Sequence, residues 1–360
     1  MQRRKFLKGA AVAGAASTLA APALAQGTRE MVIVSTWPRD FPGLGLPAQR
    51  LAARITELTD GQIDVQYFAA GERVGAFDSF DEVASGNAQA YIGADYYWKG
   101  KHPGWAPFTA IPFGMTYTEI DAWTKYGGGQ ELWDELAGEF GLKNLACGNT
   151  GVQMGGWFNK EIESADDLKG LKMRIPGLGG DVMAKLGASP VSLPGGQIYE
   201  NLVSGAIEAT EWVGPYNDYF MKFYEAAKFY YWPGMHEPGA QIAFGMNRGF
   251  WDSLSKTEQA IIEAACNEEN ARTMAETNAF NGEYLNRLIN DHGVQLREFN
   301  DDVYDAFGEA SAEVIEEARD HSDLSKRIYD SVLEKRAEIG AWTALSDTAF
   351  VQKRNNVLNR

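Results

Sequence analysis

The chain has 360 residues, with 49 Asp and Glu against 33 Lys and Arg, and a formal net charge of −16. This acidic excess argues against a nucleic-acid partner, because phosphates are bound by clustered Lys and Arg, and against binding to anionic lipid surfaces. The length exceeds what one hydrophobic core usually organises, so we expect two domains.

Residues 1–25 have the features of an export signal. Four basic residues, including Arg3-Arg4, precede an uncharged stretch rich in Ala and Gly that ends in the cleavage pattern Ala23-Leu24-Ala25. The paired arginines are typical of a twin-arginine signal, which sends a folded protein to the periplasm. A membrane anchor is the alternative, but the stretch is short and weakly hydrophobic for a span of about 20 residues. Cleavage after Ala25 would leave a net charge of −20.

After the signal, hydrophobic periodicity predicts a β-α-β-α-β unit. We expect strands at 31–34, 63–68 and 90–94 and helices at 48–58 and 77–85. The helix at 48–58 has apolar residues at helical spacing, and the strand at 63–68 alternates in polarity. Such alternation of strands and helices indicates an open α/β sheet.

A second α/β unit is predicted to begin near residue 149. We expect strands at 155–159, 172–175, 189–193 and 209–213 and helices at 164–169, 180–186 and 197–204. A strand at 242–247 could return to the first sheet. Ser255 and Glu258 form a capping box that begins a long helix, and the region from 300 to 360 is charged, amphipathic and helical. That tail would pack across a domain surface or against a second subunit.

Catalytic signatures are absent from the sequence pattern. The four histidines, His102, His236, His292 and His321, lack zinc-protease spacing, and there is no nucleophile elbow or Walker-type phosphate loop. The stretch 43–48 resembles a dinucleotide fingerprint. We interpret it as a loop and helix cap, because residues 38–42 lengthen the loop and Asp64 lies inside its strand.

The two cysteines, Cys147 and Cys266, lie far apart in the sequence. An exported protein can form a disulfide, but pairing depends on geometry that the sequence does not contain. Buried free thiols are the favoured interpretation, and the pair does not form a metal site.

Candidate ligand-binding residues lie at the ends of predicted strands and in loops, where open α/β sheets bind ligands. They are Tyr96-Tyr97-Trp98, Gln153, Arg174 and Glu211-Trp212. A fixed guanidinium at Arg174 suits bidentate capture of a carboxylate, whereas the alternative is a solvated residue at a sheet edge. For Glu211-Trp212 the alternative is a surface salt bridge beside a core aromatic residue.

Four segments at these positions carry a family resemblance. They are GVQMGGW at 151–157, LKMRIPG at 171–177, ATEWVGP at 209–215 and YWPGMHEPG at 231–239. Together they resemble the DctP-type extracytoplasmic binding proteins of tripartite ATP-independent periplasmic (TRAP) transporters, over essentially the whole chain after the signal. The branch most similar to it binds 2-oxo acids such as pyruvate, with lactate-binding relatives nearby.

The resemblance implies a ligand site with an arginine clamp and a cation. Arg174 would bind the carboxylate of a small 2-oxo or 2-hydroxy acid. Gln153, Glu211, Glu237 and the backbone carbonyl of Trp212 would hold Na⁺ or Ca²⁺, because oxygen-only ligands suit a hard cation. The resemblance also assigns a hydroxyl donor, Tyr97 with Tyr96 as the alternative because adjacent strand residues face opposite ways, and two apolar walls, Phe41 and Trp212.

The resemblance further implies the fold and the partners. It predicts two α/β domains joined by hinge strands and a long helix that spans both: domain I at 26–149 and 240–299, domain II at 150–239, and a helical tail at 300–360. Ligand would close the hinge, and the closed form would dock on the TRAP membrane permease. The branch also implies a homodimer with exchanged C-terminal helices, in a protein that catalyses nothing.

Two other functions remain open at this point. An exported oxidoreductase with a bound cofactor would also carry a twin-arginine signal. A binding protein of an ATP-driven importer would share the fold class.

Overall fold

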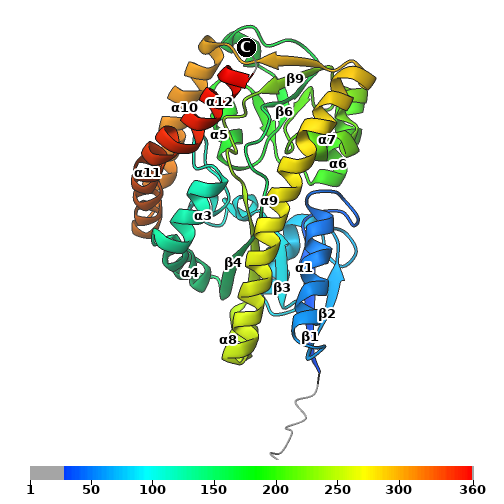
Figure 1. Ribbon diagram of the computed structural model, residues 1–360, viewed down its shortest axis with the longest axis vertical. Helices are drawn as coiled ribbons and strands as arrows, with labels where there is room; N and C mark the ends of the chain where they lie inside the picture. Colours follow the sequence, from blue (N-terminus) through cyan, green and yellow to red (C-terminus); the bar gives the residue numbers. More distant parts are fainter. Residues whose placement is uncertain (1–27, 359–360) are drawn as a thin grey trace, which may run out of the picture.

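The computed structural model describes residues 28–358, so the predicted export signal lies outside the described residues. Two β-sheets lie one above the other in Figure 1, each with helices packed around it, and one long helix runs past both. This arrangement confirms the predicted two-sheet α/β fold. Within 28–358, no helix is long and apolar enough to cross a membrane.

The first sheet has the strand order β2-β1-β3-β10-β4. Its strands are β1 (Arg29–Ser35), β2 (Ile63–Phe68), β3 (Ala90–Gly93), β4 (Leu142–Asn149) and β10 (Gln241–Asn247). β1 is parallel to β2 and β3, whereas β10 is antiparallel to β3 and β4. The chain therefore leaves the first sheet through β4 and returns to it through β10, as the strand at 242–247 predicted.

The second sheet has the strand order β11-β9-β5-β8-β6-β7. Its strands are β5 (Gly156–Phe158), β6 (Lys172–Arg174), β7 (Ser189–Val191), β8 (Ala209–Thr210), β9 (Phe229–Trp232) and β11 (Gln295–Glu298). β11 pairs with β9 in parallel. Residues 295–298, which we assigned to domain I, therefore belong to the second sheet, and the crossing between sheets falls inside the preceding helix.

The helices surround the two sheets (Figure 1). The α-helices up to residue 292 are α1 (Gly45–Leu58), α2 (Ser79–Ala84), α3 (Tyr117–Tyr126), α4 (Gly129–Glu139), α5 (Gly177–Lys185), α6 (Gly195–Val203), α7 (Pro215–Met221), α8 (Arg248–Ser253) and α9 (Lys256–His292). Short helical turns are η1 (Ala76–Asp78), η2 (Asp95–Trp98), η3 (Pro103–Phe108), η4 (Ala165–Leu168) and η5 (Phe223–Glu225).

The 37-residue helix α9 connects the two halves. Its N-terminus has the predicted capping box of Ser255 and Glu258. It packs on α1 and β4 of the first half and on α7 of the second. The thiols of Cys147 on β4 and Cys266 on α9 are buried and unpaired, as predicted.

The C-terminal region divides into a buried part and an exposed part. It contains α10 (Asp301–Arg319), α11 (Asp323–Thr343), the π-helical stretch η6 (Ala344–Thr348) and α12 (Ala349–Leu358). The apolar face of α10 and the first half of α11, including Phe307, Val314 and Ile328, is buried in its own chain. η6 and α12 contain no buried residue. Only the end of the predicted tail is thus left uncovered by this chain.

Candidate ligand-binding site

The strands of the two sheets end at a cavity between the two halves. β6 and β8 are parallel with Arg174 opposite Thr210, so Arg174 and Glu211 emerge side by side at one edge. The cavity is lined by Trp37, Leu44, Ala94, Tyr96, Tyr97, Thr150, Gln153, Arg174, Trp212, Val213, Glu237, Ala240 and Ile242. Most of the predicted site residues therefore meet at one place.

Arg174 is fully buried at the end of β6. Its Nη1 forms an ion pair with the Glu211 carboxylate, and its Nε donates to the carbonyl of Leu193 at 3.1 Å. The guanidinium carbon lies 5.2 Å from the centre of the Trp212 ring. Nη2 has no hydrogen-bond partner. This burial excludes a solvated edge residue, and it leaves the Nη2 group of a guanidinium that lines the cavity without a partner.

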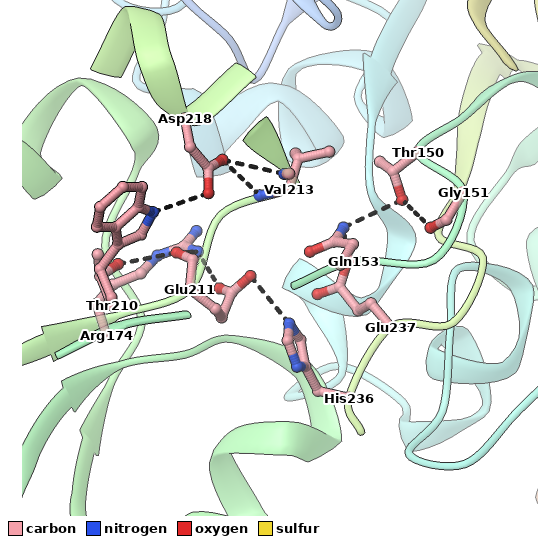
Figure 2. A network of polar contacts seen from close by, with 12 residues as sticks. Thr150, Gly151, Gln153, Arg174, Thr210, Glu211, Val213, Asp218, His236 and Glu237 are labelled. Carbon is pink, nitrogen blue, oxygen red and sulfur yellow. Dashed lines mark hydrogen bonds and ion pairs between the residues drawn. The ribbon is translucent and has the colours of Figure 1, made fainter. Parts of the chain in front are cut away.

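Glu211 lies between Arg174 and His236 (Figure 2). Its Oε2 is 3.2 Å from Nε2 of His236. A carboxylate oxygen of Glu211, one of Glu237 and a ring nitrogen of His236 lie within 4.8 Å of one another. All three side chains are buried, so their charges act on one another with little screening by water.

Gln153 completes this cluster from the loop between β4 and β5. Its Nε2 donates to Oε2 of Glu237 at 2.7 Å and to Oγ1 of Thr150 at 3.1 Å (Figure 2). Its backbone N–H donates to the carbonyl of Glu237, which ties the two loops together. The amide oxygen of Gln153 is buried without a partner. It is therefore an available ligand atom beside two carboxylates.

The protonation of the cluster reflects its burial. Burial, and then the charge of Glu211, raise the pKa of Glu237 to about 7. Burial alone would lower the pKa of His236, but the hydrogen bond and the charge of Glu211 outweigh it and raise that pKa. The raised pKa of Glu237 reflects in part its repulsion by Glu211, and a cation bound between the two carboxylates would relieve that repulsion.

Asp218 fixes the turn that follows Trp212. Its Oδ1 accepts the backbone N–H groups of Val213 and Gly214, each at 3.1 Å (Figure 2). Its Oδ2 accepts from the indole of Trp157 at 2.9 Å and the hydroxyl of Tyr230 at 2.8 Å. Because these bonds hold the backbone next to Trp212, they also set the direction of the carbonyl that we assigned to the cation.

Tyr96 and Tyr97 both line the cavity. They lie on the helical turn η2 and not in a strand, so the alternation that made them alternatives does not apply. Their rings are 4.9 Å apart in an edge-on arrangement. Tyr96 acts on the pKa of Glu237, whereas among charged groups Arg174 has the largest effect on the pKa of Tyr97. The charges of Arg174, Glu211 and Glu237 act on the pKa of both phenols, so both lie close to the polar cluster.

The apolar walls differ in part from the prediction. Phe41 packs edge-on against Trp212, with ring centres 6.0 Å apart, but is not among the residues lining the cavity. Trp37 and Leu44 of the same loop line the cavity in its place. A long irregular loop has no periodicity from which to infer which of its apolar side chains points inward.

The sequence pattern also did not assign a role to His236. It belongs to the YWPGMHEPG segment, but only the neighbouring Glu237 received a role there. A signal existed, because a histidine next to a candidate ligand in a loop is a common polar partner. Its contact with Glu211 brings together loops 25 residues apart, which no local pattern predicts.

The arrangement suits capture of an anion together with a hard cation. A buried guanidinium with an unpaired N–H can bind a carboxylate. The oxygen atoms of Gln153, Glu211 and Glu237 are ligands that Na⁺ and Ca²⁺ prefer. These donors come from separate loops, so the ligand would join the segments that line the cavity.

Comparison with known proteins gives a consistent result. A monocarboxylate 2-oxoacid-binding periplasmic protein from Nostoc sp. is 37% identical over 358 residues, 97% of this chain and 98% of the relative. A solved TRAP transporter solute-binding protein from Bordetella bronchiseptica, a mixed-occupancy dimer with copurified calcium and picolinate, is 34% identical with a TM-score of 0.90. It covers 92% of this chain and 99% of its own.

A second solved structure supports the same relationship. The TRAP periplasmic solute-binding protein from Pseudoalteromonas atlantica, with bound sodium and pyruvate, is 37% identical with a TM-score of 0.88 and covers 91% of this chain and 99% of its own. Residues 34–321 match the family described as bacterial extracellular solute-binding protein, family 7. The chain therefore belongs to the DctP family of TRAP transporter solute-binding proteins.

Proposed function

We propose that this protein captures a small 2-oxo or 2-hydroxy monocarboxylate, together with Na⁺ or Ca²⁺, and delivers it to a TRAP membrane permease. The observation that carries the proposal is the buried cluster of Arg174, Glu211, Glu237 and Gln153, which contains an unpaired guanidinium N–H and an unpaired amide oxygen. Relatives with bound pyruvate or picolinate and a metal ion support it.

Each polar group has a distinct role in the proposed complex. Arg174 would bind the ligand carboxylate through Nη2. Gln153 Oε1, Glu211, Glu237 and the carbonyl of Trp212 would hold the cation, which supplies a positive charge that the ligand's oxygens share with the two glutamates. Ionised Glu211 and Glu237 would otherwise repel an anion, so ligand and cation are expected to bind together.

The two-domain construction makes closure the transport signal. Ligand contacts from both domains would stabilise the closed arrangement, and the permease would recognise that form. The twin-arginine signal at 1–25 would place the protein in the periplasm, where the signal is removed. In this function the protein binds and releases its ligand without chemical change.

The function is tested by calorimetry on the chain lacking residues 1–25. Pyruvate and lactate are titrated in metal-free buffer and again with NaCl or CaCl₂. We expect measurable binding of at least one acid with one of the ions present, and a much weaker signal without ions. Absence of binding to every 2-oxo and 2-hydroxy monocarboxylate under all three conditions would contradict the proposal.

We also propose that the protein is a homodimer joined through its C-terminal end. Trp342, Leu345 and Phe350 are 70%, 78% and 65% exposed, a set of large apolar side chains that one copy leaves uncovered. A dimeric relative supports this reading. Because α10 and the first half of α11 belong to the chain's own core, a cut near Gly308 would damage the fold, so the test requires a cut after Thr343.

The dimer is tested by light scattering at micromolar concentration. The full chain after the signal should be a dimer, and the chain cut after Thr343 should be a monomer that still binds ligand. Tyr126→Glu, which changes a 94% exposed aromatic residue on α3, is the control and should remain dimeric. A monomeric full-length chain would refute the assembly.

A further inference from the structure

A second, apolar cavity lies directly behind the ligand cavity. Trp37, Leu44 and Ile242 line both cavities. The far side of the second cavity is formed by apolar residues of α1 and β4, among them Leu51 and Cys147. Three shared side chains thus form a partition between a polar space and an apolar one.

The partition lies on the first-domain side of the ligand cavity, whereas Arg174 lies on the second-domain side. Arg174 is the only cationic residue among those lining the ligand cavity, and Gln153 and Glu237 accompany it. In the proposed function, a 2-oxo acid places its carboxylate and oxo oxygen against these groups. Its alkyl substituent would then lie against the apolar lining, to which the three residues of the partition contribute on the first-domain side.

The partition is held in place by its surroundings. Leu44 is 6% exposed and Ile242 5% exposed. Ile242 lies on β10, the strand between β3 and β4. A Cβ added at Gly148 of β4 would lie 3.3 Å from the side chain of Ile242, so the two strands are closely packed there. Leu44 immediately precedes α1. Since buried, closely packed side chains move little, the partition limits the length of substituent that fits.

We propose that Leu44 and Ile242 set the chain length of the acid that this protein accepts. Replacing either by a smaller residue would join the two cavities and admit longer aliphatic substituents. This inference rests on the proposed function, because it assumes that a 2-oxo acid occupies the ligand cavity. It goes further by assigning ligand size selection to two uncharged side chains, one on the first sheet and one at the end of the loop before α1.

The experiment measures affinities for a series of 2-oxo acids: pyruvate, 2-oxobutyrate, 2-oxovalerate and 4-methyl-2-oxovalerate. Calorimetry is run with the unmodified protein, with Leu44→Ala and with Leu51→Ala, in the ion that supports pyruvate binding. Leu51→Ala is the matched control, since Leu51 is a buried leucine that lines only the rear cavity.

We expect the unmodified protein to lose affinity as the substituent lengthens. In Leu44→Ala the affinity ratio of 2-oxovalerate to pyruvate should rise by about fifteenfold, or about fourfold for each of two newly buried methylene groups. In Leu51→Ala the ratio should stay within about twofold of the original. Thermal unfolding of both variants shows whether each is folded. If Leu44→Ala is not folded, Leu44→Val and Ile242→Val replace it, and the affinity ratio of 2-oxovalerate to pyruvate should rise in the same direction by a smaller factor.

The outcomes separate this inference from the proposed function. If the unmodified protein binds neither these 2-oxo acids nor the corresponding 2-hydroxy acids, the proposed function fails. If it binds pyruvate but the ratio does not change in Leu44→Ala, nor in the valine variants, the partition does not select length. An equal change in Leu51→Ala would also overturn the inference, because general loosening of the first domain would then explain the selectivity.

Discussion

The side of the cavity formed by the second sheet carries ionic groups, whereas the side formed by the first sheet carries apolar and phenolic ones. Arg174 and Glu211 emerge from adjacent parallel strands of the second sheet. Trp37, Leu44 and Ile242 cover the opposite side. In the proposed function, the ionic side would set the strength of binding and the apolar side the choice of ligand shape, and domain closure would bring both onto the ligand.

The two sides are nevertheless built on the same device. Asp95 at the start of η2 accepts the indole of Trp133 and the hydroxyl of Tyr91, each at 2.8 Å. Asp218 accepts an indole and a tyrosine hydroxyl in the same way. Each buried aspartate anchors the backbone that carries its side's binding residues. The difference is that Asp218 also binds two backbone N–H groups next to the cation site.

The largest effect is expected on the ionic side, at Arg174. Arg174→Lys keeps the charge but cannot pair with Glu211, Leu193 and a ligand carboxylate at once. Binding should weaken by about 2–5 kcal/mol, the range for truncating one member of a buried charge pair. Arg39→Lys, at an exposed arginine paired with Glu72, is the control and should bind normally. Unchanged affinity in calorimetry for Arg174→Lys would place the carboxylate elsewhere.

The two anchoring aspartates should give different pH dependences of stability. Burial raises the pKa of Asp218 to about 7 and that of Asp95 to about 6, from 3.8. Because the folded state holds these protons more tightly than the unfolded state, protonation of each aspartate adds to the free energy of unfolding, and this contribution is complete below about pH 4. It is lost as the pH rises, toward 7 for Asp218 and toward 6 for Asp95, at about 1.4 kcal/mol per unit of pKa difference.

Urea unfolding between pH 4 and 8 measures this difference. The difference in free energy of unfolding between the unmodified protein and Asp218→Asn should change with pH up to about pH 7. The corresponding difference for Asp95→Asn should change only up to about pH 6. Each variant lacks one titrating group, so the other serves as its comparison. Identical pH profiles for all three proteins would show that neither aspartate titrates in this range.

A smaller loss is expected when the cation site is altered and Arg174 itself is retained. Glu211→Gln removes one anionic ligand and should weaken binding by about 1.5–3 kcal/mol, part of the loss seen on removing the ion altogether. Glu208→Gln, three residues earlier, is the control. Full affinity in ion-stripped buffer, with no metal found by mass analysis, would rule out a bridging cation.

The smallest effects should come from the phenols of the other side. Tyr97→Phe and Tyr96→Phe each remove one hydroxyl and should cost about 0.5–1.5 kcal/mol of binding. Among charged groups, Glu237 acts most on the pKa of Tyr96 and Arg174 most on that of Tyr97. We therefore expect Tyr96→Phe to alter the ion dependence and Tyr97→Phe the affinity for the acid. Calorimetry over a range of ion concentrations separates them. Equal ion dependence in both variants would contradict this division.

Local sequence pattern was sufficient for much of the fold and for the ionic side. The strands at 63–68 and 242–247 and the capped start of α9 follow from periodicity and capping, which depend on neighbouring residues. Arg174, Glu211 and Gln153 were candidates because they lie at strand ends or in a loop, where such sheets bind ligands, and the family resemblance supplied their roles.

Only the tertiary structure decided the apolar side and the limits of the elements. That Trp37 and Leu44, not Phe41, line the cavity depends on how one irregular loop packs against β10. The contact of His236 with Glu211 and the pairing of β11 with β9 depend on segments distant in the sequence. The same holds for the tail, where Phe307 and Ile328 are buried in the chain while Trp342 is exposed. An amphipathic helix specifies that a face must be covered, but the surface that covers it is determined only when the whole chain has packed.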